Sequence, residues 1–146
     1  MHSKEGQALL LEMAKYVAKY TMYGIGLTNT PGYLSMLWLN ETPVDDISPL
    51  RECPLVSLTL HRTAVRDLTP LAGTRLQRLH IGETLVSDLS PLEGLALTRL
   101  IFSPKKITTG LDVARSIPTL TEIGVTLEQR MPPAEFWRRL DDGEFD

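Results

Sequence analysis

Cysteine is almost absent from the sequence, because Cys53 is the only one among 146 residues. A single thiol cannot form an internal disulfide, which excludes the disulfide framework of small secreted domains. The first six residues also lack the basic start of a signal peptide, and no convincing cleavage site follows them. These absences lead us to expect a cytoplasmic location.

An excess of basic residues and an unbroken apolar run are missing as well. Fifteen Lys and Arg residues against eighteen Asp and Glu residues give a net charge of −3, so the electrostatic footprint of a general nucleic-acid binder is absent. The most apolar stretch, residues 8–27, is interrupted by Glu12, Lys15 and Lys19, which argues against a membrane span. We therefore expect neither a nucleic acid nor a bilayer core as a partner.

Motifs for catalysis and for cofactors are missing too. The sequence has no glycine loop that would cradle a phosphate and no metal-ligand spacing motif. His61 and His80, with Glu41 and Glu83, can converge as metal ligands or as an acid–base pair. Titratable residues on an open sheet are common, however, so we expect no catalytic activity, no cofactor and no metal.

The dominant feature that is present is an internal repeat. Four leucines that open the same phrase follow one another at intervals of 21 residues: Leu34, Leu55, Leu76 and Leu97. The members of the second copy are Leu55, Leu58, Leu60, Thr63, Val65, Asp67, Leu68, Pro70 and Leu71. Three copies that agree in residue class at these nine positions indicate a solenoid built from stacked units.

Each phrase combines a strand, a turn and a short helix. In Leu-x-x-Leu-x-Leu the last two leucines alternate with other residues, as in a half-buried strand. The threonine that follows can bond backbone groups of the turn. Ser48, Thr69 and Ser90 each precede a proline, which predicts a helix start with the hydroxyl residue as N-cap. Only a few residues remain before the next leucine, so the helix must be a single turn or a 3₁₀ piece.

Stacking these units predicts an α/β repeat solenoid. Strands near residues 36–39, 57–60, 78–81, 99–102 and 122–125 pair into a parallel β-sheet on the concave face, with short 3₁₀ or helical turns on the convex side. Two buried columns should run through the stack: Leu37, Leu58, Leu79 and Leu100, and Leu39, Leu60, Ile81 and Phe102. Each fully buried leucine contributes roughly 1.5–3 kcal/mol, which makes the columns the main source of stability.

Both ends are expected to cap the repeats of residues 34–131. Residues 7–23 have an apolar helical stripe, so residues 1–33 are predicted to form an N-terminal helical cap and loop. A helix that pairs with another chain or lies on a membrane surface is the alternative.

The repeat degrades toward the C-terminus. Pro104, Lys105 and Lys106 replace the threonine turn of the fourth copy, and residues 109–117 are compatible with a helix. Residues 132–146 are predicted to form a capping helix over 134–140 and a solvated acidic tail. Three apolar side chains should seal the last repeat: Phe136, Trp137 and Leu140.

The phrase Val-x-Asp-Leu-Ser/Thr-Pro-Leu, with its 21-residue period, resembles the bacterial leucine-rich repeats of the internalin type. The segments 102–108, 132–137 and 142–145 are similar to the closing part of leucine-rich-repeat proteins from planctomycete-like bacteria, some of which carry a protein kinase domain. This resemblance covers about residues 34–145 and implies a leucine-rich-repeat solenoid, with little indication of the ligand. The chain itself has no kinase glycine loop, no His-Arg-Asp and no Asp-Phe-Gly.

The residues between the buried leucines should point into the concavity. They form two columns: Met36, Ser57, Arg78, Arg99 and Glu122, and Trp38, Thr59, His80, Ile101 and Gly124. A tryptophan beside arginines and histidines is the composition enriched at interface hot spots, so we expect a protein partner. The predicted binding residues are Met36, Trp38, Asn40, Thr59, His61, Arg62, Arg78, His80, Arg99 and Ile101.

The charges of this surface predict the kind of partner. A positive centre on an acidic protein favours an acidic partner surface, and the two histidines predict binding that tightens as the pH falls through about 6.5. An ordinary solvated sheet face is the alternative, and Trp38 would lose its role if it packed under the N-terminal cap. A second hypothesis is a structural role in which residues 1–26 assemble an oligomer. We expect a monomer or a weak homo-oligomer.

Overall fold

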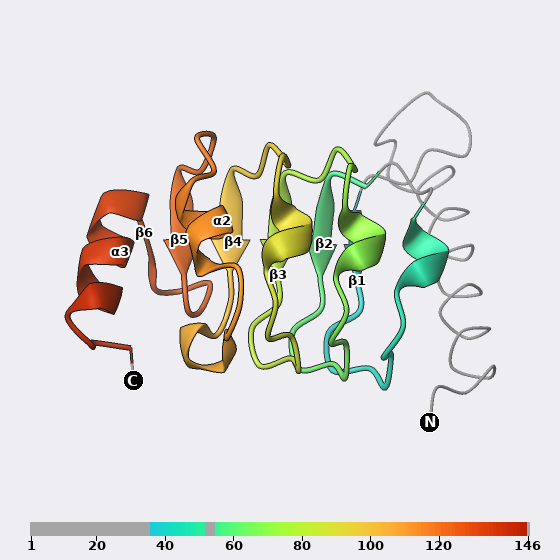
Figure 1. The fold of residues 1–146 in the computed structure, drawn as a ribbon. Coiled ribbons are helices and arrows are strands. Elements are labelled where there is room, and N and C mark those ends of the chain that lie inside the picture. Colours follow the sequence, from blue (N-terminus) through green and yellow to red (C-terminus); the bar gives the residue numbers. More distant parts are fainter. Residues whose placement is uncertain (1–35, 52–54, 146) are drawn as a thin grey trace.

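The computed structural model describes residues 36–51 and 55–145, and the predicted N-terminal cap of residues 1–33 lies outside them. In this part of the chain, six short strands form one sheet in which each strand neighbours the next one along the sequence (Figure 1). The strands are β1 (Met36–Trp38), β2 (Ser57–Thr59), β3 (Arg78–His80), β4 (Arg99–Ile101), β5 (Glu122–Gly124) and β6 (Arg130–Met131).

Short helices alternate with these strands. They are the 3₁₀ turns η1 (Ser48–Leu50), η2 (Thr69–Leu71), η3 (Ser90–Leu92) and η4 (Pro104–Lys106) and the helices α2 (Leu111–Arg115) and α3 (Pro133–Asp141). Figure 1 shows η1, η2, η3 and α2 as a row on one side of the sheet, while α3 stands beyond β6 at its end. The architecture is that of a leucine-rich-repeat-like α/β solenoid.

The register of the sheet follows the 21-residue period from β1 to β4, and β5 follows β4 after 23 residues. Strands β1 to β5 pair in parallel, and each repeat sets its middle residue opposite the middle residue of the next. The five predicted strands are therefore confirmed, each within one residue of its expected end. Strand β6 was not predicted; it pairs antiparallel with β5 and is only two residues long, too short to show an alternating pattern.

The two predicted columns form the core between the sheet and the row of short helices. All of their members are at most 2% exposed: Leu37, Leu58, Leu79, Leu100, Leu39, Leu60, Ile81 and Phe102. Because side chains alternate along a strand, burial of these residues turns their neighbours to the other side of the sheet. We call that other side the concave face.

The turns contain one confirmed and one corrected prediction. The threonine hydroxyl does bond its own turn, since Thr63 Oγ1 donates to the Leu60 carbonyl at 2.8 Å. The predicted hydroxyl N-cap is wrong, because Ser48, Thr69 and Ser90 are the first residues of their 3₁₀ turns and make no side-chain cap. An aspartate two residues earlier takes that role and accepts the backbone N–H, in the pairs Asp46 to Ser48, Asp67 to Thr69 and Asp88 to Ser90. A carboxylate is the stronger acceptor, and this spacing is that of an Asx turn.

The fourth repeat keeps the strand of the other repeats, but different elements follow it. Helix α2 begins 21 residues after η3 and stands where a 3₁₀ turn would be expected. The additional turn η4 occupies the place of the threonine turn, where Lys106 Nζ donates to the Thr84 carbonyl at 3.2 Å. A longer helix on the convex side thus replaces the repeated phrase.

Helix α3 closes the core at the C-terminal end. Phe136 and Trp137 are buried, and their ring centroids lie 5.6 Å and 6.4 Å from that of Phe102, the last member of the second buried column. The described acidic residues of the tail are exposed, as predicted, and the tail also makes contacts with the rest of the domain. Arg115 holds Asp141 with two hydrogen bonds of 2.8 and 3.1 Å, and the Phe145 ring stacks on Phe136 at 4.9 Å.

Candidate functional site

The concave face carries a cavity of about 220 Å³. Its lining residues are Met36, Trp38, Ser57, Leu58, Thr59, Arg78, Leu79, His80, Arg99 and Leu127. Six of the ten predicted binding residues meet here: Met36, Trp38, Thr59, Arg78, His80 and Arg99. We call this site the concave cavity. The parallel register brings these residues together, because it sets Met36, Ser57, Arg78 and Arg99 side by side on adjacent strands.

Leu127 is a member of the cavity that the sequence reasoning missed. It lies in the connection between β5 and β6 and is 42% exposed. No repeat copy contains an equivalent residue, so the 21-residue pattern gave no signal for it. The connection turns back on the sheet, since a Cβ on Gly124 would lie only 2.5 Å from the Gln129 carbonyl oxygen. It therefore forms a raised wall at one end of the concave face.

This wall corrects the prediction for Ile101. Ile101 pairs in register with Gly124 and is fully buried, so its side chain cannot contact a partner. The regular alternation predicted exposure, but the β5–β6 connection folds back over Gly124, the register partner of Ile101. Ile101 packs in the protein instead of lining the surface.

Trp38 is exposed and Arg78 is partly exposed in the concave cavity. Trp38 is 65% exposed, the largest value among the exposed large hydrophobic residues of the described ranges. The guanidinium of Arg78 has no hydrogen-bond or ion-pair partner in residues 36–51 and 55–145. Both groups are fixed on strands, and both are free to meet another molecule.

Arg99 is partly engaged. Its Nη2 donates to Glu122 at 3.2 Å, and Glu122 also pairs with Arg130 at 3.1 Å. The Nε of Arg99 is buried and lacks an acceptor in the described part of the chain. Arg99 therefore retains a donor, and its charge is only partly offset because Glu122 also pairs with Arg130.

Asn40, His61 and Arg62 lie outside the concave cavity, where the strands end. Asn40 Oδ1 accepts the backbone N–H of His61 at 3.0 Å, which gives it a structural role. Arg62 bonds Glu41 and Glu83, both at 3.2 Å, and His61 Nε2 lies 2.8 Å from Glu83 Oε2. We call Glu41, His61, Arg62 and Glu83 the strand-end cluster. Its charges are satisfied internally.

The backbone of the strand-end cluster has an unusual conformation. Glu41, Arg62 and Glu83 occupy the same position of three successive repeats and have φ values of 58°, 59° and 55°. Residues other than glycine seldom adopt this left-handed region. The alternating charges of the three residues pair along the stack and hold the turn together. The hydrogen bonds from His61 and Arg62 also lower the pKa of Glu83.

The two histidines contact each other, with ring centroids 4.9 Å apart. His80 is 9% exposed, and its Nδ1 accepts the Gly82 N–H at 3.1 Å, which leaves the proton on Nε2. Burial, and then the neighbouring His61, lower the pKa of His80 to about 4. His80 is thus neutral near pH 6.5, so the predicted pH-dependent charge cannot come from it. Nowhere in the described ranges do three His, Cys, Asp or Glu residues gather as a metal site.

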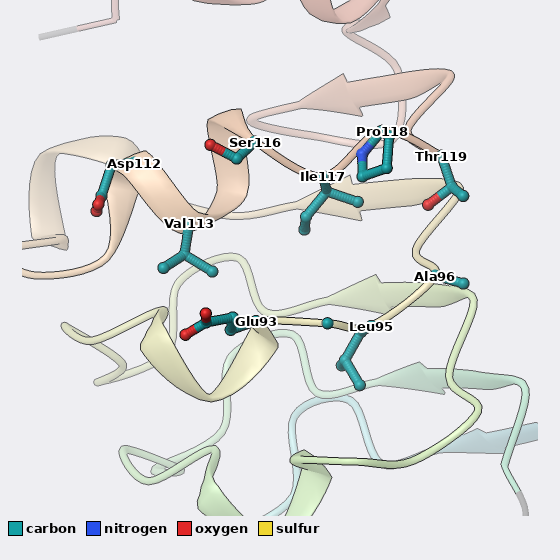
Figure 2. Close-up of a pocket in the computed structure, with 10 residues that line it drawn as sticks. Glu93, Leu95, Ala96, Asp112, Val113, Ser116, Ile117, Pro118 and Thr119 are labelled. Carbon is teal, nitrogen blue, oxygen red and sulfur yellow. The ribbon is translucent and has the colours of Figure 1, made fainter.

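A larger cavity of about 430 Å³ lies on the convex side (Figure 2). It runs between the segment that follows η3 and the segment from α2 to Thr119, and Figure 2 shows Val113 and Ile117 on the side opposite Glu93 and Leu95. None of the predicted binding residues lines it. Its wall contains two carboxylates and no basic residue, so its charge is opposite to that of the concave cavity.

Comparison of the chain with protein families and with curated proteins finds no significant match. In the part of the chain that the structure describes, no helix has the length and apolar character needed to cross a membrane.

Proposed function

We propose that the chain is a non-catalytic interaction module that holds a protein partner on its concave face. The exposure of Trp38 carries this proposal, since a tryptophan that is 65% exposed on a rigid strand has a large apolar area to offer. Tryptophan and arginine are the residue types most enriched at interface hot spots, and Arg78 stands two strands away in the same cavity.

The rigidity of the surface supports binding. The lining residues of strands β1 to β4 are spaced by the sheet at about 4.8 Å, so few side-chain or loop rearrangements are needed when a partner docks. The apolar and charged groups also lie next to each other. A partner that covers Trp38 excludes water from Arg78, which strengthens any ion pair made there.

The histidine pair favours binding over catalysis. His61 is joined to Glu83, which Arg62 already holds, and His80 accepts a backbone N–H. In the described residues, no serine, threonine or cysteine side chain bonds either imidazole ring, so an activated nucleophile is not assembled.

The proposal is tested by measuring partner affinity with matched variants. The partner is first captured from the source organism with the full chain as bait and then purified. Trp38→Ala should raise the dissociation constant of the partner complex by at least about thirtyfold, as expected for the loss of a hot spot. Leu85→Ala is the control, because Leu85 is 49% exposed and does not line the concave cavity. Binding that depends on Leu85 and not on Trp38 would place the partner elsewhere.

The second hypothesis, assembly through an N-terminal helix, concerns residues outside the described ranges. Its test is the mass of the full chain in solution, compared with a chain that lacks residues 1–26. A dimer that is lost on deletion would favour assembly, and a monomer in both cases would favour the interaction module.

A further inference from the structure

The concave cavity has an apolar group at each end. Trp38 and Leu127 are two of the three exposed large hydrophobic residues in the described ranges, and both line this one cavity. Trp38 stands on β1, and Leu127 comes from the β5–β6 connection, at the other end of the strand order. Apolar surface is therefore offered at two separated points.

An unpaired positive charge lies between these ends. Arg78, on β3, has no partner in the described residues, whereas Arg99 shares Glu122 with Arg130. Glu128, on the same connection as Leu127, is close enough to His80 to act on it electrostatically. Arg78 would attract one carboxylate of a ligand to the cavity. Glu122 and Glu128 would repel further carboxylates, so a run of acidic residues is disfavoured.

Hydrogen-bond donors accompany that charge. The Nε of Arg99 is buried with no acceptor in the described part of the chain, and His80 keeps its proton on Nε2. A buried donor without an acceptor is costly, so a ligand oxygen that reaches Arg99 Nε is favoured. A carboxylate has two oxygens and can accept from Arg78 and from one of these donors together.

The size and spacing of the cavity define the shape of the ligand. Its volume of about 220 Å³ is below the usual range for small-molecule sites, roughly 300–1,000 Å³, and suits side chains of a macromolecule. From β1 to β4 there are three strand spacings, about 14 Å. In an extended peptide, residues i and i+4 lie on one face about 13–14 Å apart, with residue i+2 between them.

We infer that the concave cavity recognises an extended segment of the pattern apolar–x–acidic–x–apolar, which crosses the strands with its acidic side chain at Arg78 and its apolar side chains at Trp38 and Leu127. This inference rests on the proposed function and specifies the partner segment. It excludes a polyacidic partner, which the positive centre alone would have allowed.

The test is a titration of the isotope-labelled full chain with a defined peptide, followed by NMR. The probe is a capped peptide of sequence Ser-Leu-Ser-Glu-Ser-Leu-Ser. We expect saturable shifts in β1 to β4 and in the side-chain Nε–H signals of Arg78 and Arg99. A matched peptide with glutamine in place of glutamate should bind about tenfold more weakly, because it loses charge-assisted hydrogen bonds. A peptide with serine in place of both leucines should also bind more weakly.

Variants of the protein assign the carboxylate contact. Arg78→Gln should remove the preference for glutamate over glutamine, whereas Arg75→Gln should keep it, because Arg75 is exposed in the same repeat and does not line the cavity. Equal binding of the two peptides, or no shifts on the concave face up to about 5 mM peptide, overturns the inference. If the captured partner still requires Trp38 in that case, the proposed function stands and only the recognised pattern is wrong.

Discussion

The two faces of the same strands differ in how much they repeat. The face toward the short helices carries leucine in the middle of β1, β2, β3 and β4, and the opposite face carries Met36, Ser57, Arg78 and Arg99 at equivalent positions. A stacked core accepts only side chains that fill the same space in every unit, whereas a solvated face has no such requirement. One face therefore specifies the fold, and the other is free to specify a partner.

The largest effect should follow from placing a charge on the core face. Leu79→Asp introduces an unpaired carboxylate where the side chain is 1% exposed, which costs several kcal/mol and should unfold the domain. Arg78→Asp is the matched control, since it places the same residue one position away on the concave face. Thermal melts followed by circular dichroism test the pair. A cooperative, near-wild-type melt for Leu79→Asp would show that the two faces are not distinct.

A second prediction extends the comparison to the end of the stack. Phe136→Ala removes a fully buried ring that packs on Phe102 and Trp137, so the free energy of unfolding should fall by about 3–5 kcal/mol. Removal of residues 132–146 should destabilise the protein further and promote aggregation. Arg138→Ala, on the exposed side of α3, is the control in chemical denaturation. An unchanged midpoint for Phe136→Ala would mean that α3 is an appendage and not a cap.

A third prediction concerns His80, which belongs to the concave face but is buried. Its folded-state pKa of about 4 is below the value of about 6.5 expected for the unfolded chain. The unfolded chain therefore binds the proton first, and the free energy of unfolding should fall by up to about 3 kcal/mol as the pH drops from 6.5 toward 4.

The imidazole signals of His80 in an NMR pH titration measure this value directly. His80→Gln should show a shallower loss of stability over the same pH range. Titration of His80 near 6.5 would contradict its burial and would restore the pH dependence that the sequence predicts for this surface.

The smallest effect is expected in the strand-end cluster. Glu83→Gln weakens exposed ion pairs that salt screens, so neither the melting temperature nor the affinity for the partner should change measurably. Both are measured at low and at high ionic strength. A strong loss of affinity would move the binding site from the concave cavity to the strand ends.

The sequence predicted the molecule best where it repeats. The 21-residue period was sufficient for the strands, the buried columns and the 3₁₀ turns, because each copy supports the same interpretation. The identity of the helix cap was missed, since Asp67 and Thr69 lie within three residues of each other and both types can cap. Pattern alone cannot decide between two good acceptors in one turn.

The site was predicted less well because it depends on a segment that occurs once. The β5–β6 connection folds over Gly124 beside the buried Ile101, supplies Leu127 and ends in β6, and none of these follows from the repeat. The separation of Arg62 from Arg78 was also hidden. The sequence predicts both arginines on the binding surface, and only their neighbours in the structure show that Arg62 is paired and Arg78 is not.

The most direct test of the concave-face proposal uses the two tryptophans of the chain, Trp38 and Trp137. Trp137 lies on the buried side of α3, so a Trp137→Phe variant keeps an aromatic ring there and leaves Trp38 as the only tryptophan reporter. When the purified partner is added to saturation, the emission of Trp38 should shift to shorter wavelength and its quenching by acrylamide should decrease. Unchanged emission and quenching with the partner bound would contradict the proposal that this face holds it.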